Sequence, residues 1–154
     1  MSNYGLVGGK LRIRDLAWSV CDCLGNGANE SAIDLLIETC GAETNFGRYK
    51  DRSIYAGLGI MQFDKIPFND VKARTRDKHK ATILEYYDID VNLVEWDHIR
   101  YNPLLSILFA RLKYKLVPEE IPTTLDGRAY YWKKYYNTLD GKGTIEHYIE
   151  VNGS

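Results

Sequence analysis

Residues 102–112 constrain the fold more than any other part of this sequence. Asparagine followed by proline is a typical helix start, because the asparagine side chain caps the first turn and proline fits within it. The apolar residues that follow recur with the spacing of one broad helical face, and they are Leu104, Leu105, Leu108, Phe109 and Leu112. Other elements must cover such a face, so the sequence predicts a core built mainly from helices.

Helical periodicity also dominates the rest of the chain. Further helices are expected over residues 11–24, from Ser31 onward, after Pro67, over residues 80–87 and 127–137, and after a cap at Thr144. In the second of these helices, Ser31 and Asp34 stand in a capping-box-like arrangement.

Residues 48–63 break the helical pattern. Gly57 and Gly59 separate short apolar groups in this segment, which indicates short strands or an ordered loop. The predicted fold class is therefore mainly α, with a small β or irregular insertion near residues 50–63.

The length of 154 residues and the average composition indicate one globular domain. We expect a monomer with a single domain over residues 1–154, in which residues 1–30 form an N-terminal helical extension packed on the rest. Twenty basic and 21 acidic residues give a net charge of −1. This balance argues against bulk electrostatic binding to nucleic acid or to an anionic membrane. The longest apolar run, residues 104–110, is too short to span a bilayer, so we expect no stable membrane association.

The three cysteines, Cys21, Cys23 and Cys40, leave their pairing open. Cys21 and Cys23 lie two positions apart in a predicted helix, so their side chains point apart and should not pair with each other. A bridge from either to Cys40 is one alternative, and buried free thiols in a reducing cytoplasm are the other. The histidines are scattered singly, so we expect no zinc site.

Glu43 is the first candidate for catalysis. If the second helix continues through Gly41, its buried stripe through Leu36 and Cys40 leads to Glu43 near the helix end, beside the core. Partial burial there would disfavour the charged form and raise the pKa, as a general acid near neutral pH requires. The alternative is a helix-terminal glutamate that caps a neighbour or lies in solvent.

The second candidate is the segment GLGIMQFD at residues 57–64. Its two glycines allow the backbone to approach a ligand closely or to take a positive φ. Gln62 offers both a hydrogen-bond donor and an acceptor, which suits the amide and hydroxyl groups of a sugar. Neither glycine motif that binds phosphate is present, and the alternative is an ordinary glycine-rich turn.

The third candidate is the aromatic segment YYWKKYYNT at residues 130–138. A tyrosine ring buries its body and hydrogen-bonds at its edge, which suits the wall of a saccharide groove. Tyr136 and Asn137, at the end of the predicted helix, fit this role best. The alternative is aromatic packing in the core, which we favour for Trp132.

In chain order these segments read Glu43-Thr44, GLGIMQ and YYN. This order resembles the goose-type lysozyme and soluble lytic transglycosylase superfamily. There a catalytic glutamate begins an E-S or E-T pair at a helix end, a G-L-M-Q-like segment lines the glycan cleft, and a Y-N pair closes it. The strings WKKYYNTLDGKGT and NPLLSILFARLKY also look like small bacteriophage or prophage endolysins of this superfamily. The resemblance covers residues 31–144 and implies a lysozyme-like α+β fold.

The resemblance implies a role for each matching residue. Glu43 matches the catalytic acid, and Ile60 stands where leucine is commoner. The positions that match substrate-binding segments are Thr44, Gly59, Met61, Gln62, Tyr136 and Asn137. The implied activity is cleavage of the MurNAc–GlcNAc β-1,4 linkage in the glycan strands of peptidoglycan, with no metal or organic cofactor.

The reaction that follows protonation depends on a second group. In lytic transglycosylases the substrate's own N-acetyl group and 6-hydroxyl take part and give a 1,6-anhydro end. An inverting hydrolase instead needs a second carboxylate about 6.5–9.5 Å away to activate water. Asp64 matches an acidic position of goose-type lysozymes, and Asp51 resembles another, although its spacing differs. Both also fit surface or turn carboxylates, so the sequence leaves hydrolase and transglycosylase open.

No secretion signal is visible, because charged residues come first and Asp22 interrupts the apolar stretch behind them. We therefore expect synthesis in the host cytoplasm. A wall-degrading enzyme made there needs either a membrane hole made by another protein or delivery from a virus particle. We predict the first, a phage endolysin released by a holin. The alternative from another class is a non-catalytic glycan-binding or virion structural protein with the same fold.

Overall fold

The computed structural model describes residues 4–49, 57–137 and 143–153. Within these ranges the structure is mainly helical and has no strand, which confirms the mainly α class. The α-helices are α1 (Gly9–Leu24), α2 (Ala32–Thr44), α3 (Lys65–Arg74), α4 (Asp77–Tyr87), α5 (Pro103–Lys115), α6 (Leu125–Trp132) and α7 (Ile145–Asn152). Two short 3-10 turns, η1 (Val91–Leu93) and η2 (Trp96–Ile99), precede α5, and a π-helical turn, η3 (Lys133–Asn137), follows α6. No helix in the described ranges has both the length and the apolar character needed to cross a bilayer.

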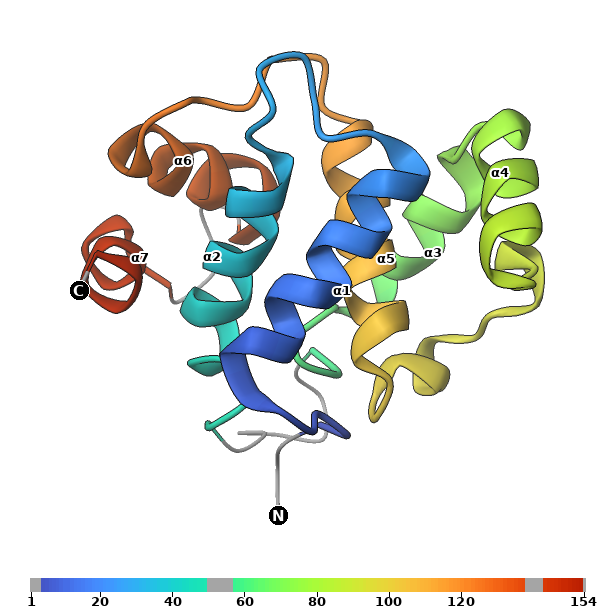
Figure 1. Cartoon of the computed structure of the whole chain (residues 1–154), viewed down its shortest axis with the longest axis horizontal. Coiled ribbons are helices and arrows are strands. Elements are labelled where there is room, and N and C mark those ends of the chain that lie inside the picture. Colours follow the sequence, from blue (N-terminus) through green and yellow to red (C-terminus); the bar gives the residue numbers. More distant parts are fainter. Residues whose placement is uncertain (1–3, 50–56, 138–142, 154) are drawn as a thin grey trace.

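Helix α5 lies at the centre of the fold. Five consecutive residues along it are fully buried, namely Ser106, Ile107, Leu108, Phe109 and Ala110. Helices α1 and α2 pack against α5, with α3 and α4 to one side of this centre and α6 and α7 to the other (Figure 1). Consecutive buried residues over more than one turn cover every side of a helix, so the segment with the broadest apolar face forms the core.

The N-terminal helix belongs to the same core. Helix α1 contributes fully buried side chains, namely Ile13, Ala17 and Val20. At its C-terminal end, Arg111 Nε donates to the carbonyl oxygen of Gly25, and Lys115 Nζ donates to that of Leu24, both at 3.0 Å. Cations are favourable at a helix C-terminus, where the last carbonyls have no partner within the helix. These two bonds fasten the N-terminal segment to α5.

Side-chain caps define two helix starts as the sequence predicts. Asn102 Oδ1 accepts a hydrogen bond of 3.1 Å from the backbone N–H of Leu105, and Pro103 is the first residue of α5. Thr144 Oγ1 accepts a hydrogen bond of 3.1 Å from the N–H of His147 at the start of α7. Each cap satisfies an N–H group that lacks a partner within its helix.

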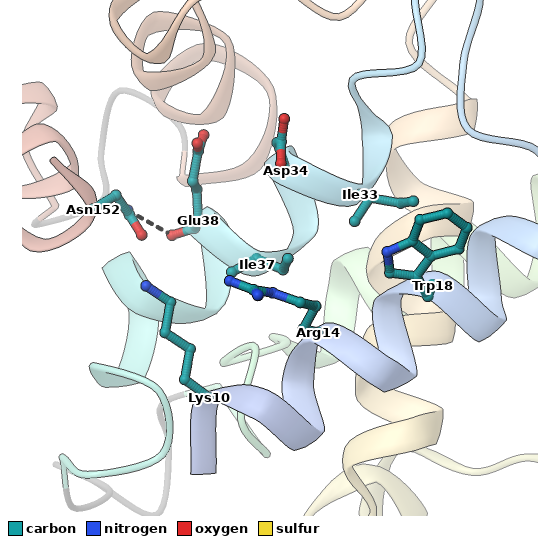
Figure 2. A pocket seen from close by; sticks show the side chains of 8 residues that line it. All are labelled: Lys10, Arg14, Trp18, Ile33, Asp34, Ile37, Glu38 and Asn152. Carbon is teal, nitrogen blue, oxygen red and sulfur yellow. Dashed lines mark hydrogen bonds between the residues drawn. The ribbon is translucent and has the colours of Figure 1, made fainter.

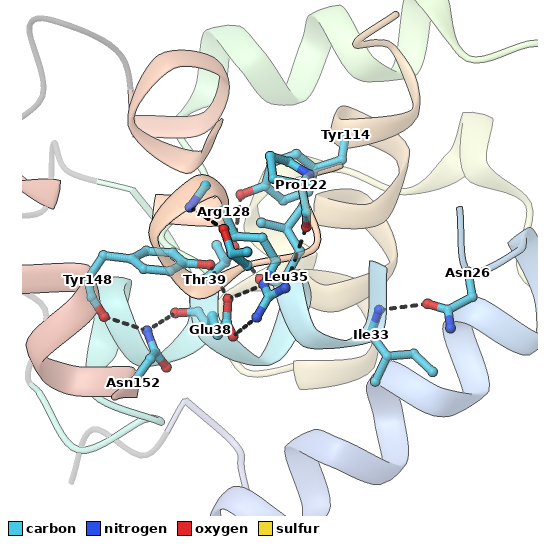
Figure 3. Close-up of polar contacts among 12 residues, drawn as sticks. Asn26, Ile33, Leu35, Glu38, Thr39, Tyr114, Pro122, Arg128, Tyr148 and Asn152 are labelled. Atoms are coloured by element: carbon cyan, nitrogen blue, oxygen red, sulfur yellow. Dashed lines mark hydrogen bonds and ion pairs between the residues drawn. The ribbon is translucent and has the colours of Figure 1, made fainter. Parts of the chain in front are cut away.

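Other helix starts differ from the prediction. Helices α1, α4 and α6 begin at Gly9, Asp77 and Leu125, two or three residues before the expected positions. Ser31 precedes α2, but its side chain makes no capping bond. Asn26 Oδ1 instead accepts from the N–H of Ile33 at 2.8 Å (Figure 3), and so it replaces the expected serine cap. Helix α3 begins at Lys65, before Pro67, because the first turn of a helix tolerates proline.

Residues 57–63 form a tight loop that is closed by one pair of residues. Leu58 and Phe63 exchange two backbone hydrogen bonds of 2.9 Å in an isolated antiparallel bridge. This part of the predicted insertion is therefore irregular and contains no β-strand, while residues 50–56 lie outside the described part of the chain.

All three cysteines are free thiols. Cys21 and Cys40 are buried, and burial raises the pKa of Cys21 to about 11. The bridge to Cys40 that the sequence left open is therefore absent, and the buried thiols pack as small apolar side chains.

Candidate active site

Glu43 lies in the last turn of α2, which continues through Gly41 as the sequence analysis expects. A Cβ on Gly41 would lie 2.6 Å from both Asn152 Oδ1 and Phe46 Cζ, so glycine lets α7 and the loop after α2 pack closely on this helix. Asn45, in the left-handed conformation at a φ of 49°, ends the helix. The local sequence thus places the Glu43 carboxylate at a helix end beside the core.

The Glu43 carboxylate is half-buried and accepts a hydrogen bond from a neutral donor. Nε1 of Trp132, a residue only 1% exposed, donates to Glu43 Oε2 at 2.9 Å. Burial raises the pKa of Glu43 from an ordinary 4.5 to about 7. The Trp132 hydrogen bond, the Lys113 charge and a hydrogen bond from Asn137 lower this pKa. The nearby charge of Asp64 raises it.

A pKa of about 7 means that many molecules hold a proton on Glu43 at neutral pH and can still release it readily. A general acid works best when its pKa lies near the working pH. Partial burial of a carboxyl group is a common way of meeting this requirement. Glu43 therefore has the protonation behaviour that the role of catalytic acid demands.

Three residues expected to bind glycan are buried and support the site from within. The side chains of Thr44, Met61 and Tyr136 are at most 6% exposed. Thr44 Oγ1 donates to the carbonyl oxygen of Ile60 at 2.8 Å, and Tyr136 Oη donates to that of Met61 at 2.7 Å. These bonds join the loop that carries Met61 to α2 on one side and to η3 on the other, so they hold the loop beside Glu43.

Gly59 and Gln62 form the turn within this loop. Gly59 has a φ of +75°, and a Cβ there would lie 2.5 Å from the carbonyl oxygen of Ile99 and 2.6 Å from Ser106 Oγ. Glycine is therefore needed both for the backbone conformation and for the close approach. Gln62 is half-buried, and its Nε2 donates to the carbonyl oxygen of Gly59 at 2.9 Å. This bond directs the Gln62 amide along the turn.

Asn137 is a predicted site residue whose side chain acts on the Glu43 carboxylate. It ends η3, and π-helical turns are rare and often occur at functional sites. Lys133 Nζ donates to Asn137 Oδ1 at 2.8 Å, which leaves the amide N–H groups to donate to Glu43. Side chains from α2, α6 and η3 thus meet in one cluster, formed by Glu43, Trp132 and Asn137.

Asp64 is the candidate for a second carboxylate that lies in the described part of the chain. Asp64 is exposed and directly precedes α3, but its side chain does not cap that helix. Its charge raises the pKa of Glu43, so the two carboxylates lie within electrostatic reach of each other. Asp51 lies outside the described residues.

Two residues of the site escape prediction from the sequence, Trp132 and Lys113. The expected packing role of Trp132 is confirmed, since its ring centroid lies 5.2 Å from that of Tyr148. Its hydrogen bond to Glu43 joins positions 89 residues apart, which no local pattern reveals. Lys113 carries a weak signal, because it follows the buried Phe109 by one helical turn and so lies on an apolar face.

Glu38, a second glutamate on α2, is neutralised by a basic partner. Arg128 pairs with it through two bonds, Nε to Oε1 at 2.7 Å and Nη2 to Oε2 at 2.9 Å. Tyr148 Oη donates to Oε1 at 2.8 Å, and Asn152 Nδ2 donates to the Glu38 carbonyl oxygen at 2.9 Å (Figure 3). These four residues form the Glu38 network, which joins α2 to α6 and α7. Glu38 is thus a structural anion, in contrast to Glu43.

A surface hollow of about 260 Å³ lies between α1, α2 and the end of α7 (Figure 2). Lys10, Arg14 and Trp18 line it from α1, and Asp34 and Glu38 line it from α2. Its two carboxylates are the exposed Asp34 and the Arg128-paired Glu38. The ion-paired carboxylate of the hollow therefore serves the packing of α2 against α6 and α7.

Comparisons with known proteins identify no family for this chain. No protein-family model matches the chain, and no curated protein and no solved structure matches it either. Among the described residues, no group of three or more histidine, cysteine or acidic side chains is arranged to hold a metal ion. The interpretation of the site therefore depends on the environment of Glu43.

Proposed function

We propose that this chain cleaves the MurNAc–GlcNAc β-1,4 linkage of peptidoglycan, with Glu43 as the general acid. One observation carries the proposal: Glu43 is a half-buried carboxyl group with a pKa of about 7, beside the loop of residues 57–63 and the Tyr136–Asn137 turn. The order of Glu43-Thr44, GLGIMQ and YYN along the chain supports the same assignment through its resemblance to goose-type lysozymes and lytic transglycosylases.

The first chemical step uses the proton held on Glu43. Its carboxyl group donates that proton to the glycosidic oxygen as the bond to C1 of MurNAc breaks, which leaves an oxocarbenium-like centre and an ionised Glu43. In the transglycosylase route, the 6-hydroxyl of the same sugar then attacks C1 and gives its proton back to Glu43. In the hydrolase route, a second carboxylate activates a water molecule that attacks C1.

The test is incubation of the protein with purified sacculi, followed by mass spectrometry of the soluble fraction. Release of muropeptides supports the proposal, and 1,6-anhydro or reducing ends then distinguish transglycosylase from hydrolase. Binding to sacculi with no release would favour a glycan-binding or virion structural protein instead. For an active enzyme, the proposed setting is host lysis by a phage endolysin.

Replacing Asp64 by asparagine should keep sacculus cleavage within about tenfold of the wild type and should move its alkaline limit to lower pH. The Asp64 charge raises the pKa of Glu43, so its removal lowers that pKa, and Glu43 then loses its proton at lower pH. We expect Asp64 to act through charge only, because its carboxylate is exposed and does not cap α3.

The measurement is a pH profile of muropeptide release, with Asp77→Asn on α4 as an exposed control. A rate loss of about 100-fold or more for Asp64→Asn, the size of a general acid–base contribution, would contradict this expectation. It would identify Asp64 as the second carboxylate of a hydrolase.

A further inference from the structure

A lysine from the central helix reaches the cluster around Glu43. We propose that Lys113 is a positioning residue of this site: its ammonium group holds the turn that carries Tyr136 and Asn137 and supplies the positive charge that Glu43 and Asp64 face. This inference rests on the proposed function for its catalytic meaning. Its structural content can be tested without substrate.

The contacts of Lys113 are directed at the turn. Its Nζ donates to the carbonyl oxygen of Tyr136 at 3.0 Å and lies 4.3 Å from the centroid of the Tyr136 ring. It also lies 5.6 Å from the centroid of Phe63, the residue that closes the loop of residues 57–63. One ammonium group therefore touches both segments that flank Glu43, the loop and η3.

The carbonyl that Lys113 binds lies where the helix changes its form. Tyr136 belongs to a π-helical turn, whose hydrogen bonds run from residue i to residue i+5 and which is uncommon without outside support. An ammonium group attracts a carbonyl oxygen and also the face of an aromatic ring. Lys113 thus supports Tyr136 at both its backbone and its side chain, and Asn137 follows directly.

The placement of Lys113 carries an energetic cost that its neighbours reduce. Burial lowers the pKa of Lys113, and the charges of Glu43, Asp64 and Asp70 raise it. A long side chain on a helix can usually extend its charged end into water. Lys113 instead remains half-buried, and its ammonium group is directed at Tyr136. A role for the Lys113 charge in the proposed site explains why this lysine stays half-buried.

Charged and titratable groups reach Glu43 from several packed elements. Asp64 raises the pKa of Glu43 from the start of α3, and Lys113 lowers it from α5. The phenols that interact with the Glu43 charge are Tyr114 and Tyr136. From α7, His147 Nε2 lies 3.1 Å from the carbonyl oxygen of Ala42. Lys113 is the basic group in this set that lowers the pKa of Glu43, and it offsets the charge of Asp64.

The test is Lys113→Met, compared with Lys72→Met as a matched control. Lys72 Nζ also donates to a carbonyl oxygen, that of Val94 at 2.7 Å, and lies 5.7 Å from the ring centroid of Phe68. The control removes the same kind of contact, yet Lys72 is not among the charges that act on Glu43. Any general cost of losing a half-buried lysine therefore appears in both variants.

We expect Lys113→Met to raise the pKa of Glu43, because removal of a positive charge disfavours the ionised carboxylate. In ¹³C NMR of the labelled protein, the midpoint of the Glu43 carboxyl titration should lie about 0.5 to 1 pH unit higher than in the wild type. The alkaline limit of sacculus cleavage should move in the same direction, and the maximal rate should fall about 3- to 30-fold as the turn loosens. Lys113→Arg should restore the pH profile, whereas Lys72→Met should leave it unchanged.

An unchanged Glu43 titration in Lys113→Met would overturn the inference, as would an equal change in Lys72→Met. If Lys113→Met does not fold, Lys113→Gln takes its place with Lys113→Arg as the comparison that keeps the charge, and the inference fails if Lys113→Gln titrates like the wild type. The NMR titration needs no substrate. If the wild type does not cleave sacculi, the proposed function is refuted. The titration still decides whether Lys113 sets the pKa of Glu43.

Discussion

Replacing Glu43 by glutamine should lower the rate of sacculus cleavage by about 10²- to 10⁴-fold, the usual contribution of a positioned general acid. Glutamine keeps the size of the side chain and can still accept the Trp132 hydrogen bond, which measures 2.9 Å in the wild type. It cannot deliver a proton to a glycosidic oxygen. The loss should therefore appear in the maximal rate, with binding to sacculi retained in a sedimentation assay.

The same substitution should stabilise the fold above neutral pH. The carboxyl of Glu43 has a pKa of about 7 in the folded protein against an ordinary 4.5, so the folded state holds the proton more tightly. Its favourable contribution is complete below pH 4.5 and is lost as the pH rises through 7. The free energy of unfolding of the wild type should thus fall by about 3 kcal/mol relative to Glu43→Gln between pH 4 and pH 9.

Urea unfolding of both proteins at the two pH values measures this difference. Glu85→Gln on α4 is the matched control, because Glu85 is exposed and should change neither activity nor the pH dependence of stability. Full activity of Glu43→Gln would remove Glu43 from the mechanism. Reduced activity with unchanged pH dependence of stability would instead contradict the raised pKa.

Replacing Arg128 by methionine should lower the free energy of unfolding by about 3–5 kcal/mol, because it leaves the Glu38 charge without its ionic partner. The side chains of Arg128 and Glu38 are only 9% and 13% exposed, and their shortest ion-pair distance is 2.7 Å. Water cannot replace the guanidinium group fully at such a site. Urea unfolding at pH 7 measures the loss.

Two companion variants isolate the effect of the unpaired charge. Arg74→Met breaks the surface ion pair between Arg74 and Asp70, whose side chains are 58% and 50% exposed. It should lower the free energy of unfolding by less than about 1 kcal/mol. The double variant Arg128→Met with Glu38→Leu removes both charges and should recover part of the stability, because no buried anion remains. If the double variant is no more stable than Arg128→Met alone, lost packing is the cause.

Local signals explain why much of the fold could be predicted. The caps at Asn102 and Thr144 involve atoms only a few residues apart, so the sequence reveals them directly. The periodicity of α2 likewise places Glu43 beside the core, because a helix keeps its faces along its length. These features need no knowledge of the rest of the molecule.

Contacts between distant segments explain what could not be predicted. The Asn26 side chain replaces the expected Ser31 cap because the chain before α2 turns back onto that helix. The bond from Trp132 to Glu43 depends on how α6 meets α2, which helical periodicity does not determine. The β character expected near residues 50–63 reduces, in residues 57–63, to one bridged pair, since backbone pairing needs a partner strand.

In the candidate site, too, local sequence signals and contacts between distant segments determine different features. The family resemblance assigns Thr44 and Met61 to a substrate-binding role. It does not indicate which way their side chains face, and both prove to be buried supports. Burial is decided by the whole fold, so side chains that line a site and side chains that hold it look alike in the sequence.

The π-helical turn η3 makes the site sensitive to the number of residues in the chain as well as to their identity. A π-helical turn accommodates one more residue between bonded groups than an α-helix does. Loss of one residue from it would restore the α-helical spacing and rotate Tyr136 and Asn137 by about 100° about the helix axis. The bond from Tyr136 to Met61 and the amide at Glu43 would be lost together. Homologous sequences should therefore vary in residue type at the exposed Lys134 and yet keep the number of residues in this segment constant.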